Sequence, residues 1–221
     1  MSDTRIDLHT HSIGSPDGGL TATDYSALLN AQVLHFIAVT DHDRIDTAQE
    51  LQKTLGDQII VGQEITTSQG EIIGLYLSEK ITPGQTAQQT VKAIKQQGGL
   101  VYIPHPFETV RKGIPKEVLD SIAGLADIVE THNGRAVFQN KGPAAVAWAR
   151  LHGKVSAASS DAHGKRGMAT SFTTISGVPT RDNLVELLKT GRQQTARPPL
   201  HSLLYPKYHR LRGKLKKTKK T

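Results

Sequence analysis

Short apolar runs in this chain repeatedly end in a polar segment that contains histidine, and this arrangement limits the folds that the chain can adopt. Five of the ten histidines lie in such segments, each with a carboxylate nearby in the sequence. The runs themselves, such as Phe36-Ile37-Ala38-Val39, are continuous rather than alternating. A strand that is apolar on both faces is typical of a parallel sheet covered by helices. The sequence therefore predicts an α/β fold with polar groups at the strand ends.

The number of strand–helix units favours a closed barrel over an open sheet. The chain has 221 residues, enough for one domain with a full core. We expect about seven strands, each followed by a helix or a turn, at residues 6–11, 36–40, 59–61, 72–77, 100–103, 127–130 and 155–158. About seven such units in one domain favour a barrel, in which chemistry lies at the C-terminal strand ends.

The basic charge of the chain is concentrated at its C-terminal end. The formal net charge is +7, but from Leu187 onward there are 11 Lys or Arg residues and no Asp or Glu. Before that point, 16 basic residues face 20 acidic ones. We therefore expect a mildly acidic domain over residues 1–195 and a basic, flexible tail over 196–221, because a segment with little to bury repels itself. Such a tail could contact nucleic acid weakly.

Two pairs of potential metal ligands have the spacing of a strand. Side chains two residues apart point to the same face of a strand, so His9 and His11 can bind one ion together, as can Asp161 and His163. With His42 and His105 at further strand ends, these pairs indicate a metal site. The chain has no cysteine, so its metal ligands are nitrogen and oxygen atoms.

The order of these motifs resembles the PHP superfamily, the polymerase and histidinol phosphatase domains. The motifs are His9-Thr10-His11-Ser12, Thr40-Asp41-His42-Asp43, Glu64, His105-Pro106 and Ser160-Asp161-Ala162-His163. The resemblance implies a distorted seven-stranded (β/α)7 TIM-like barrel. It also implies a trinuclear metal site and the hydrolysis of phosphate esters.

Carried over by position, the resemblance implies ligands for three divalent ions, with manganese, zinc or iron as the candidate metals. The ligands are His9, His11, Glu64 and Asp161 for the first ion, Glu64, Glu71 and His105 for the second, and Asp17, His42 and His163 for the third. Glu71 stands where many relatives have a histidine. A carboxylate at this position shifts the preference toward harder ions such as manganese.

The same resemblance implies how the site would act on a phosphate ester. Glu64 and Asp161 would hold the ions between which a hydroxide attacks phosphorus in line. Arg135 and Arg166 are the predicted clamps for the phosphoryl group, because arginine binds phosphate through two parallel hydrogen bonds. Asp41 and Asp43 are predicted to orient histidines.

We therefore expect a metal-dependent phosphoesterase that acts on a nucleotide, an oligonucleotide end or another small phosphorylated metabolite. A histidinol-phosphate or sugar-phosphate phosphatase is the alternative within the same chemistry. A proofreading or structural module associated with a polymerase, and a nucleic-acid-binding protein that acts through its tail, are alternatives of other classes. No signal segment and no apolar run of membrane-spanning length is present in this sequence, so a cytoplasmic location is the expectation.

Overall fold

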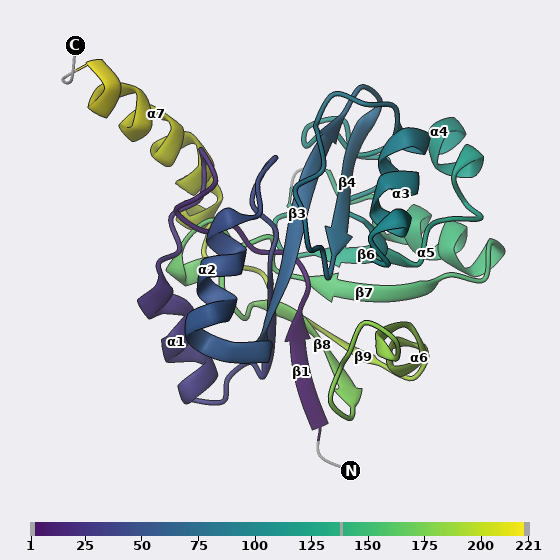
Figure 1. The fold of residues 1–221 in the computed structure, drawn as a ribbon, viewed down its shortest axis with the longest axis horizontal. Coiled ribbons are helices and arrows are strands. Elements are labelled where there is room, and N and C mark those ends of the chain that lie inside the picture. Colours follow the sequence, from purple (N-terminus) through teal and green to yellow (C-terminus); the bar gives the residue numbers. More distant parts are fainter. Residues whose placement is uncertain (1–2, 138, 219–221) are drawn as a thin grey trace.

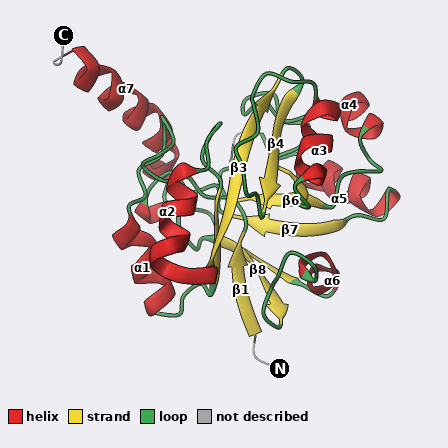
Figure 2. Cartoon of the chain, in the orientation of Figure 1, coloured by secondary structure: helices red, strands yellow, loops and turns green. Residues whose placement is uncertain are grey.

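The strands of the protein form one sheet that curls into a nearly closed barrel (Figures 1 and 2). The computed structural model describes residues 3–137 and 139–218. The nine strands are hydrogen-bonded in the order β7-β6-β5-β4-β3-β2-β1-β8-β9. Their bounds are β1 Asp3–Asp7, β2 Phe36–Val39, β3 Ile59–Thr67, β4 Gly70–Leu75, β5 Leu100–Ile103, β6 Ile128–Asn133, β7 Val155–Ser159, β8 Ser171–Ser176 and β9 Arg192–Thr195.

The expected count of seven strands is wrong, because two further strands extend the sheet. Each of the seven expected strands overlaps one of β1–β7, although the strand expected at 6–11 shares only residues 6–7 with β1; β8 and β9 were not predicted. All four residues of β9 are polar and exposed, so the strand carries no apolar signal. The pairing is also less uniform than expected: β4 is antiparallel to both of its neighbours, and β8 is antiparallel to β1 and β9.

The seam between β1 and β7 closes differently at its two ends. Beyond the C-terminal ends of these strands, Thr10 pairs with Ala162 in a parallel bridge. The backbone N–H of His11 donates to Ala162 at 2.9 Å, and that of Asp161 donates to His9 at 2.9 Å. At the other end β8 lies against β1, and its Thr173 hydroxyl accepts from the Ala158 N–H at 2.9 Å. The segments that carry His9, His11 and Asp161 are therefore held side by side.

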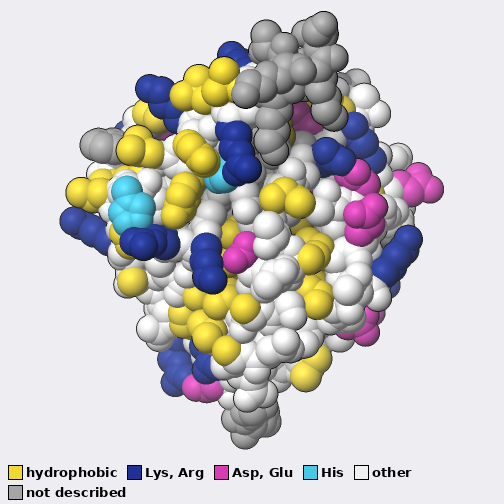
Figure 3. Space-filling view, turned by 90° about the vertical axis from the view of Figure 1, so that its left-hand side faces the viewer, with side chains coloured by type: hydrophobic (Ala, Val, Ile, Leu, Met, Phe, Trp, Pro, Cys, Tyr) yellow, Lys and Arg dark blue, Asp and Glu magenta, His cyan; other side chains and the backbone are white. Residues whose placement is uncertain are grey.

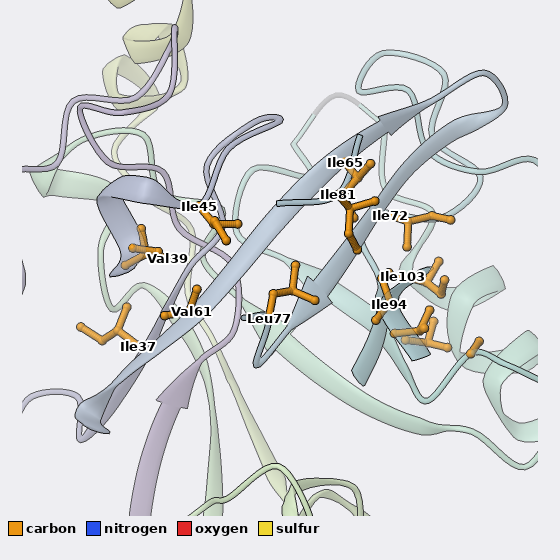
Figure 4. Packing of buried hydrophobic residues seen from close by; sticks show 14 of the residues in the cluster. Ile37, Val39, Ile45, Val61, Ile65, Ile72, Leu77, Ile81, Ile94 and Ile103 are labelled. Atoms are coloured by element: carbon orange, nitrogen blue, oxygen red, sulfur yellow. The ribbon is translucent and has the colours of Figure 1, made fainter. Parts of the chain in front are cut away.

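Seven α-helices belong to the described part of the chain, and several of them cover the outside of the sheet. They are α1 Ala22–Asn30, α2 Asp46–Leu55, α3 Ala87–Gln96, α4 Lys116–Ser121, α5 Gly142–Leu151, α6 Leu184–Lys189 and α7 Tyr205–Thr218. Neighbouring residues of β2 alternate between two apolar layers: Ile37 and Val39 pack with helix side chains, while Ala38 belongs to the second layer. Figure 4 shows the first layer, with side chains from β2, β3 and β4.

The C-terminal segment is helical, whereas the sequence predicts a flexible tail at 196–221. A 3₁₀ turn at Leu200–Leu204 leads into α7, whose far half projects from the body (Figure 1). The division at residue 195 and the mobility of the segment stay predictions, and residues 1–2, 138 and 219–221 lie outside the described part. None of the helices in 3–137 and 139–218 has the length and apolar character needed to cross a membrane.

Candidate metal centre

The nine predicted ligand residues come together at one end of the barrel. His9 and His11 follow β1, His105 follows β5, and Asp161 and His163 follow β7. Glu64 lies within β3, where it bridges to His42, and Glu71 lies within β4 opposite Thr66. Asp17 lies in the loop before α1. All of these residues are buried except His42, whose side chain is 19% exposed.

One cluster of close contacts surrounds His11. Its Nε2 lies 3.1 Å from His9 Nε2, 3.2 Å from Glu64 Oε2 and 3.4 Å from Asp161 Oδ1. Two ligand atoms that bind one ion tetrahedrally at 2.0–2.2 Å lie about 3.4 Å apart. The spacing of these donor atoms therefore fits a shared divalent cation.

A second cluster forms around Asp17. Its Oδ2 lies 3.6 Å from His42 Nε2 and 3.5 Å from His163 Nε2. The other ring nitrogen of His42, Nδ1, lies 3.3 Å from Glu64 Oε2. His42 therefore links the Asp17 cluster to Glu64, because each of its ring nitrogens faces one of these two carboxylates.

Glu71 joins the site through Glu64 and its neighbours. Glu64 Oε1 lies 3.1 Å from His105 Nε2, and the carboxylate of Glu71 lies 4.0 Å from the same nitrogen and 3.9 Å from His42 Nδ1. Glu71 is buried and lies on β4, so its carboxylate is within reach of an ion at this cluster. Four sets of ligand atoms within 4.8 Å could hold an ion: His11, Asp17, His42 and His163; His9, His11 and Asp161; His9, Glu64 and His105; His42, Glu64 and Glu71.

Two of these residues have a strained backbone. His105 has a φ of +30° and Asp161 a φ of +51°, in a region that side-chain-bearing residues rarely adopt. Such a conformation costs about 1–3 kcal/mol and persists where the surroundings determine it. Here the strain turns each chain sharply after its strand, toward the cluster.

Glu130 holds two of the histidines in place, a role that was not predicted. Its carboxylate accepts from His9 Nδ1 at 3.1 Å, from the Tyr102 hydroxyl at 3.0 Å and from the backbone N–H of His105 at 2.7 Å. Because Nδ1 of His9 donates to Glu130, Nε2 is left free to bind a metal. Glu130 ends an apolar run on β6, which is the signal that could have identified it.

Asp41 and Asp43 do not orient histidines, contrary to the expectation. Asp41 accepts from the backbone N–H of Ser12 at 2.6 Å, and Asp43 accepts from that of Thr66 at 2.8 Å. Both residues therefore fix the loops that carry ligands rather than the imidazole rings.

The structure brings Arg135 to the site but not Arg166. Arg135 Nη1 lies 3.4 Å from Asp161 Oδ2, whereas Arg166 is exposed and contacts His201 at 3.3 Å. Arg111, which was not among the predicted site residues, binds Asp161 Oδ2 at 2.9 Å and Glu108 at 2.6 Å. Its side chain is only 12% exposed. The sequence places Arg111 among the loop cations beyond His105 but does not single it out as a clamp, because it lies eight residues beyond β5 in a loop without periodicity.

A cavity of about 430 Å³ opens over the cluster. It is lined by the carboxylates of Asp17, Asp43, Glu64, Glu71 and Asp161, by three of the histidines, and by the cations Arg111, Lys112, Arg135 and Arg210. With every carboxylate ionised and the histidines neutral, as when they bind ions, these side chains carry five negative and four positive charges. With bound divalent ions the balance becomes positive, which favours an anionic ligand.

Burial and mutual repulsion set the protonation of the metal-free cluster. Burial, and then the charge of Glu64, raise the pKa of Glu71 to about 8. Burial alone would lower the pKa of His42, but the carboxylates of Glu64 and Asp17 outweigh it and raise the pKa to about 9. At pH 7 both groups therefore carry a proton that a metal ion has to displace.

We therefore expect metal binding to release protons, with an affinity that rises as the pH increases from 6 to 9. Calorimetry of Mn²⁺ binding at pH 7, in two buffers with different ionisation enthalpies, measures the number released. Glu71→Gln should release about one proton fewer per chain than wild type, while the exposed Glu50→Gln should match wild type. Equal release by Glu71→Gln and wild type at the same ion stoichiometry would contradict the role of Glu71.

Two archaeal proteins are similar to this chain in sequence, while no family model matches it. The uncharacterized protein MJ1587 of Methanocaldococcus jannaschii is 33% identical over 149 residues, which are 62% of this chain and 87% of MJ1587. The uncharacterized protein MJ0417 of the same organism is 30% identical over 168 residues. The match covers 72% of this chain and 65% of MJ0417, less than two thirds of that protein's length.

Solved structures share the fold at lower identity. A two-domain protein from Bacteroides vulgatus that contains a predicted PHP-like metal-dependent phosphoesterase has a TM-score of 0.71 and 19% identity, over 88% of this chain and 65% of that one. The lesion-specific endonuclease EndoQ from Pyrococcus furiosus has a TM-score of 0.62 and 15% identity, over 87% and 57%. An amidohydrolase from Chromobacterium violaceum with bound sulfate has a TM-score of 0.58 and 18% identity, over 91% and 96%.

The chain belongs to the same family as MJ1587. Its fold is shared with solved PHP-like proteins, and its histidines and carboxylates cluster at the strand ends.

Proposed function

We propose that this protein is a metal-dependent phosphoesterase that hydrolyses the phosphate ester of a nucleotide, an oligonucleotide end or another small phosphorylated metabolite. The observation that carries the proposal is the set of four overlapping ligand groups, which share Glu64, His9, His11 and His42. Glu64 and His42 line the cavity over the cluster. Donors that are shared between groups suit several ions close together better than one isolated ion.

The residues divide into ligands, positioning groups and phosphate-binding groups. His9, His11, Glu64 and Asp161 would hold the first ion, Glu64, Glu71 and His105 the second, and Asp17, His42 and His163 the third. Bound divalent ions supply a nucleophile at neutral pH and neutralise phosphoryl charge. The nitrogen and oxygen donors are consistent with Mn, Zn or Fe, and three carboxylates besides Asp17 favour a hard ion.

The arginines over the cluster would bind the substrate. Arg111 and Arg135 both lie at Asp161, on the wall of the cavity, where a guanidinium can donate to two phosphoryl oxygens. We retain Arg135 as a clamp and propose Arg111 beside it. Arg166 would need to move to reach the cavity, so the proposal does not rest on it.

A nucleic-acid end is supported by two observations. EndoQ, which shares the fold, is a lesion-specific endonuclease. On the face that α1, α2 and α7 share, Lys and Arg side chains lie among hydrophobic ones and some Asp and Glu side chains (Figure 3). A small sugar phosphate stays the alternative within the same chemistry.

Metal analysis of the purified protein, followed by a phosphate-release screen, tests the proposal. The screen covers mononucleotides, nucleoside bisphosphates, sugar phosphates and short oligonucleotides, each with Mn²⁺, Zn²⁺ or Fe²⁺. We expect release that requires a divalent ion and is lost on chelation. A protein loaded with ions that releases neither phosphate nor a mononucleotide from any of these esters would refute the proposed function.

A further inference from the structure

Helix α7 packs against the loops that carry two of the metal-site residues. The ring of Tyr205 lies over Gly164, the residue after His163, and a Cβ at Gly164 would come within 2.5 Å of that ring. The ring of His209 lies over Gly19, and a Cβ there would come within 2.3 Å of the imidazole. The helix approaches this closely because neither loop position bears a side chain.

This packing brings Arg210 to the cavity. Arg210 Nη2 lies 2.5 Å from Asp17 Oδ2, the same oxygen that faces the Nε2 atoms of His42 and His163. The Arg210 side chain is 61% exposed, while that of Asp17 is 1% exposed. Pro206 and Arg210 both line the cavity. A cation from the last helix thus neutralises the carboxylate where the third ion is expected.

The two positive charges compete for one oxygen. An ion held by Asp17, His42 and His163 would take Oδ2, and the guanidinium would lose its partner. Because the side chain is largely exposed and its helix stays packed on Gly19 and Gly164, Arg210 would remain at the cavity mouth. At the cavity mouth, the anion closest to the Arg210 guanidinium would then be a phosphoryl group bound at the ions.

We propose that Arg210 is a substrate-binding residue of this site, which pairs with Asp17 in the metal-free protein and with a phosphoryl oxygen once the ion is bound. It faces the cavity from the Asp17 side, whereas Arg111 and Arg135 lie at Asp161. Helix α7 is then part of the active site rather than an appended tail. This inference rests on the proposed phosphoesterase function.

The test uses the full chain and inorganic phosphate as the probe. Calorimetry measures phosphate binding to the Mn²⁺-loaded protein for wild type, Arg210→Ala, Arg210→Lys and the control Arg212→Ala, an exposed arginine of the same helix that does not line the cavity. We expect Arg210→Ala to weaken phosphate binding about ten- to a hundredfold, as for loss of a charge-assisted hydrogen bond. The phosphate affinity of Arg210→Lys should lie between those of wild type and Arg210→Ala, and the affinity of Arg212→Ala should match that of wild type.

A titration of the metal-free proteins with Mn²⁺ gives a second, independent measurement. Loss of the competing cation should make the weakest Mn²⁺ site of Arg210→Ala about two- to fivefold tighter, because solvent reaches the guanidinium and screens its charge. Unchanged phosphate affinity in Arg210→Ala would overturn the proposal.

A structural role for the arginine is distinguished by His209→Ala, which removes a packing contact of α7 but keeps Arg210. If His209→Ala weakens phosphate binding as much as Arg210→Ala and neither variant binds Mn²⁺ more tightly, Arg210 only docks the helix and the proposal is wrong. Phosphate binding does not require turnover. If the wild-type protein binds phosphate through Arg210 but hydrolyses no ester, the proposed function is refuted and the inference about Arg210 is not.

Discussion

His9→Ala and Asp161→Ala are each expected to bind fewer divalent ions than wild type and to release no phosphate above the background of the metal-free protein. His9 belongs to two of the four ligand groups, and Asp161 Oδ1 lies 3.4 Å from His11 and 3.6 Å from His9. Loss of either residue therefore removes a donor at the most crowded part of the cluster. The loss of metal affinity should exceed the roughly 10–100-fold that removal of an outer-sphere partner costs.

Elemental analysis after exhaustive dialysis, together with phosphate release, measures both effects. His201→Ala is the matched control, because His201 is exposed and contacts Arg166 outside the cavity. It should keep the metal content and activity of wild type. Full metal content or full activity in His9→Ala or Asp161→Ala would refute the assignment of these ligands.

Arg111→Ala is expected to destabilise the metal-free protein by about 3–5 kcal/mol, because it leaves buried Glu108 without its arginine and leaves Asp161 with the more distant Arg135. Arg111 pairs with Asp161 at 2.9 Å and Glu108 at 2.6 Å, and both acids are at least 95% buried. Bound divalent ions would neutralise Asp161 from the other side. Arg111→Ala should therefore lose less stability in the metal-loaded protein than in the metal-free one. Part of the loss should remain, because Glu108 stays unpaired.

Urea unfolding of the metal-free and Mn²⁺-loaded forms measures this difference. Arg44→Ala is the control, since its pair with Asp46 is exposed at 43% and 58% of the two side chains. Its expected cost is at most about 1 kcal/mol. An Arg111→Ala protein as stable as Arg44→Ala, or one that metal does not rescue, would show that Arg111 is not the cation that balances Asp161.

The strand ends were the part of the site that local sequence made visible. Continuous apolar runs predicted strands β1–β7, and the polar residues after them predicted His9, His11, His105, Asp161 and His163, which the structure brings together. Burial on both faces and a period of two are properties of a few neighbouring residues, so they can be read without knowing the fold. The strands β8 and β9 were missed because the first is partly polar and the second is entirely exposed.

The assignment of Glu71 came from the resemblance, and only the structure gives it a physical basis. Its place on β4, opposite Thr66 of β3, turns its carboxylate toward His42 and His105. The turn at Ser68 and Gly70 is compatible with either a surface or a buried side chain, and the register of the hairpin decides between them.

The sequence, together with the resemblance that its motifs carry, predicted the α/β class and the nine residues that the structure brings together. The tertiary structure alone decided which cations face them: it brought in Arg111 and Arg210 and left Arg166 outside the cavity. Ligands at strand ends are positioned by regular hydrogen bonding, whose geometry a local pattern predicts. Arginines on loops and on a distant helix are positioned by packing between segments as far apart as 193 residues, which no local pattern encodes.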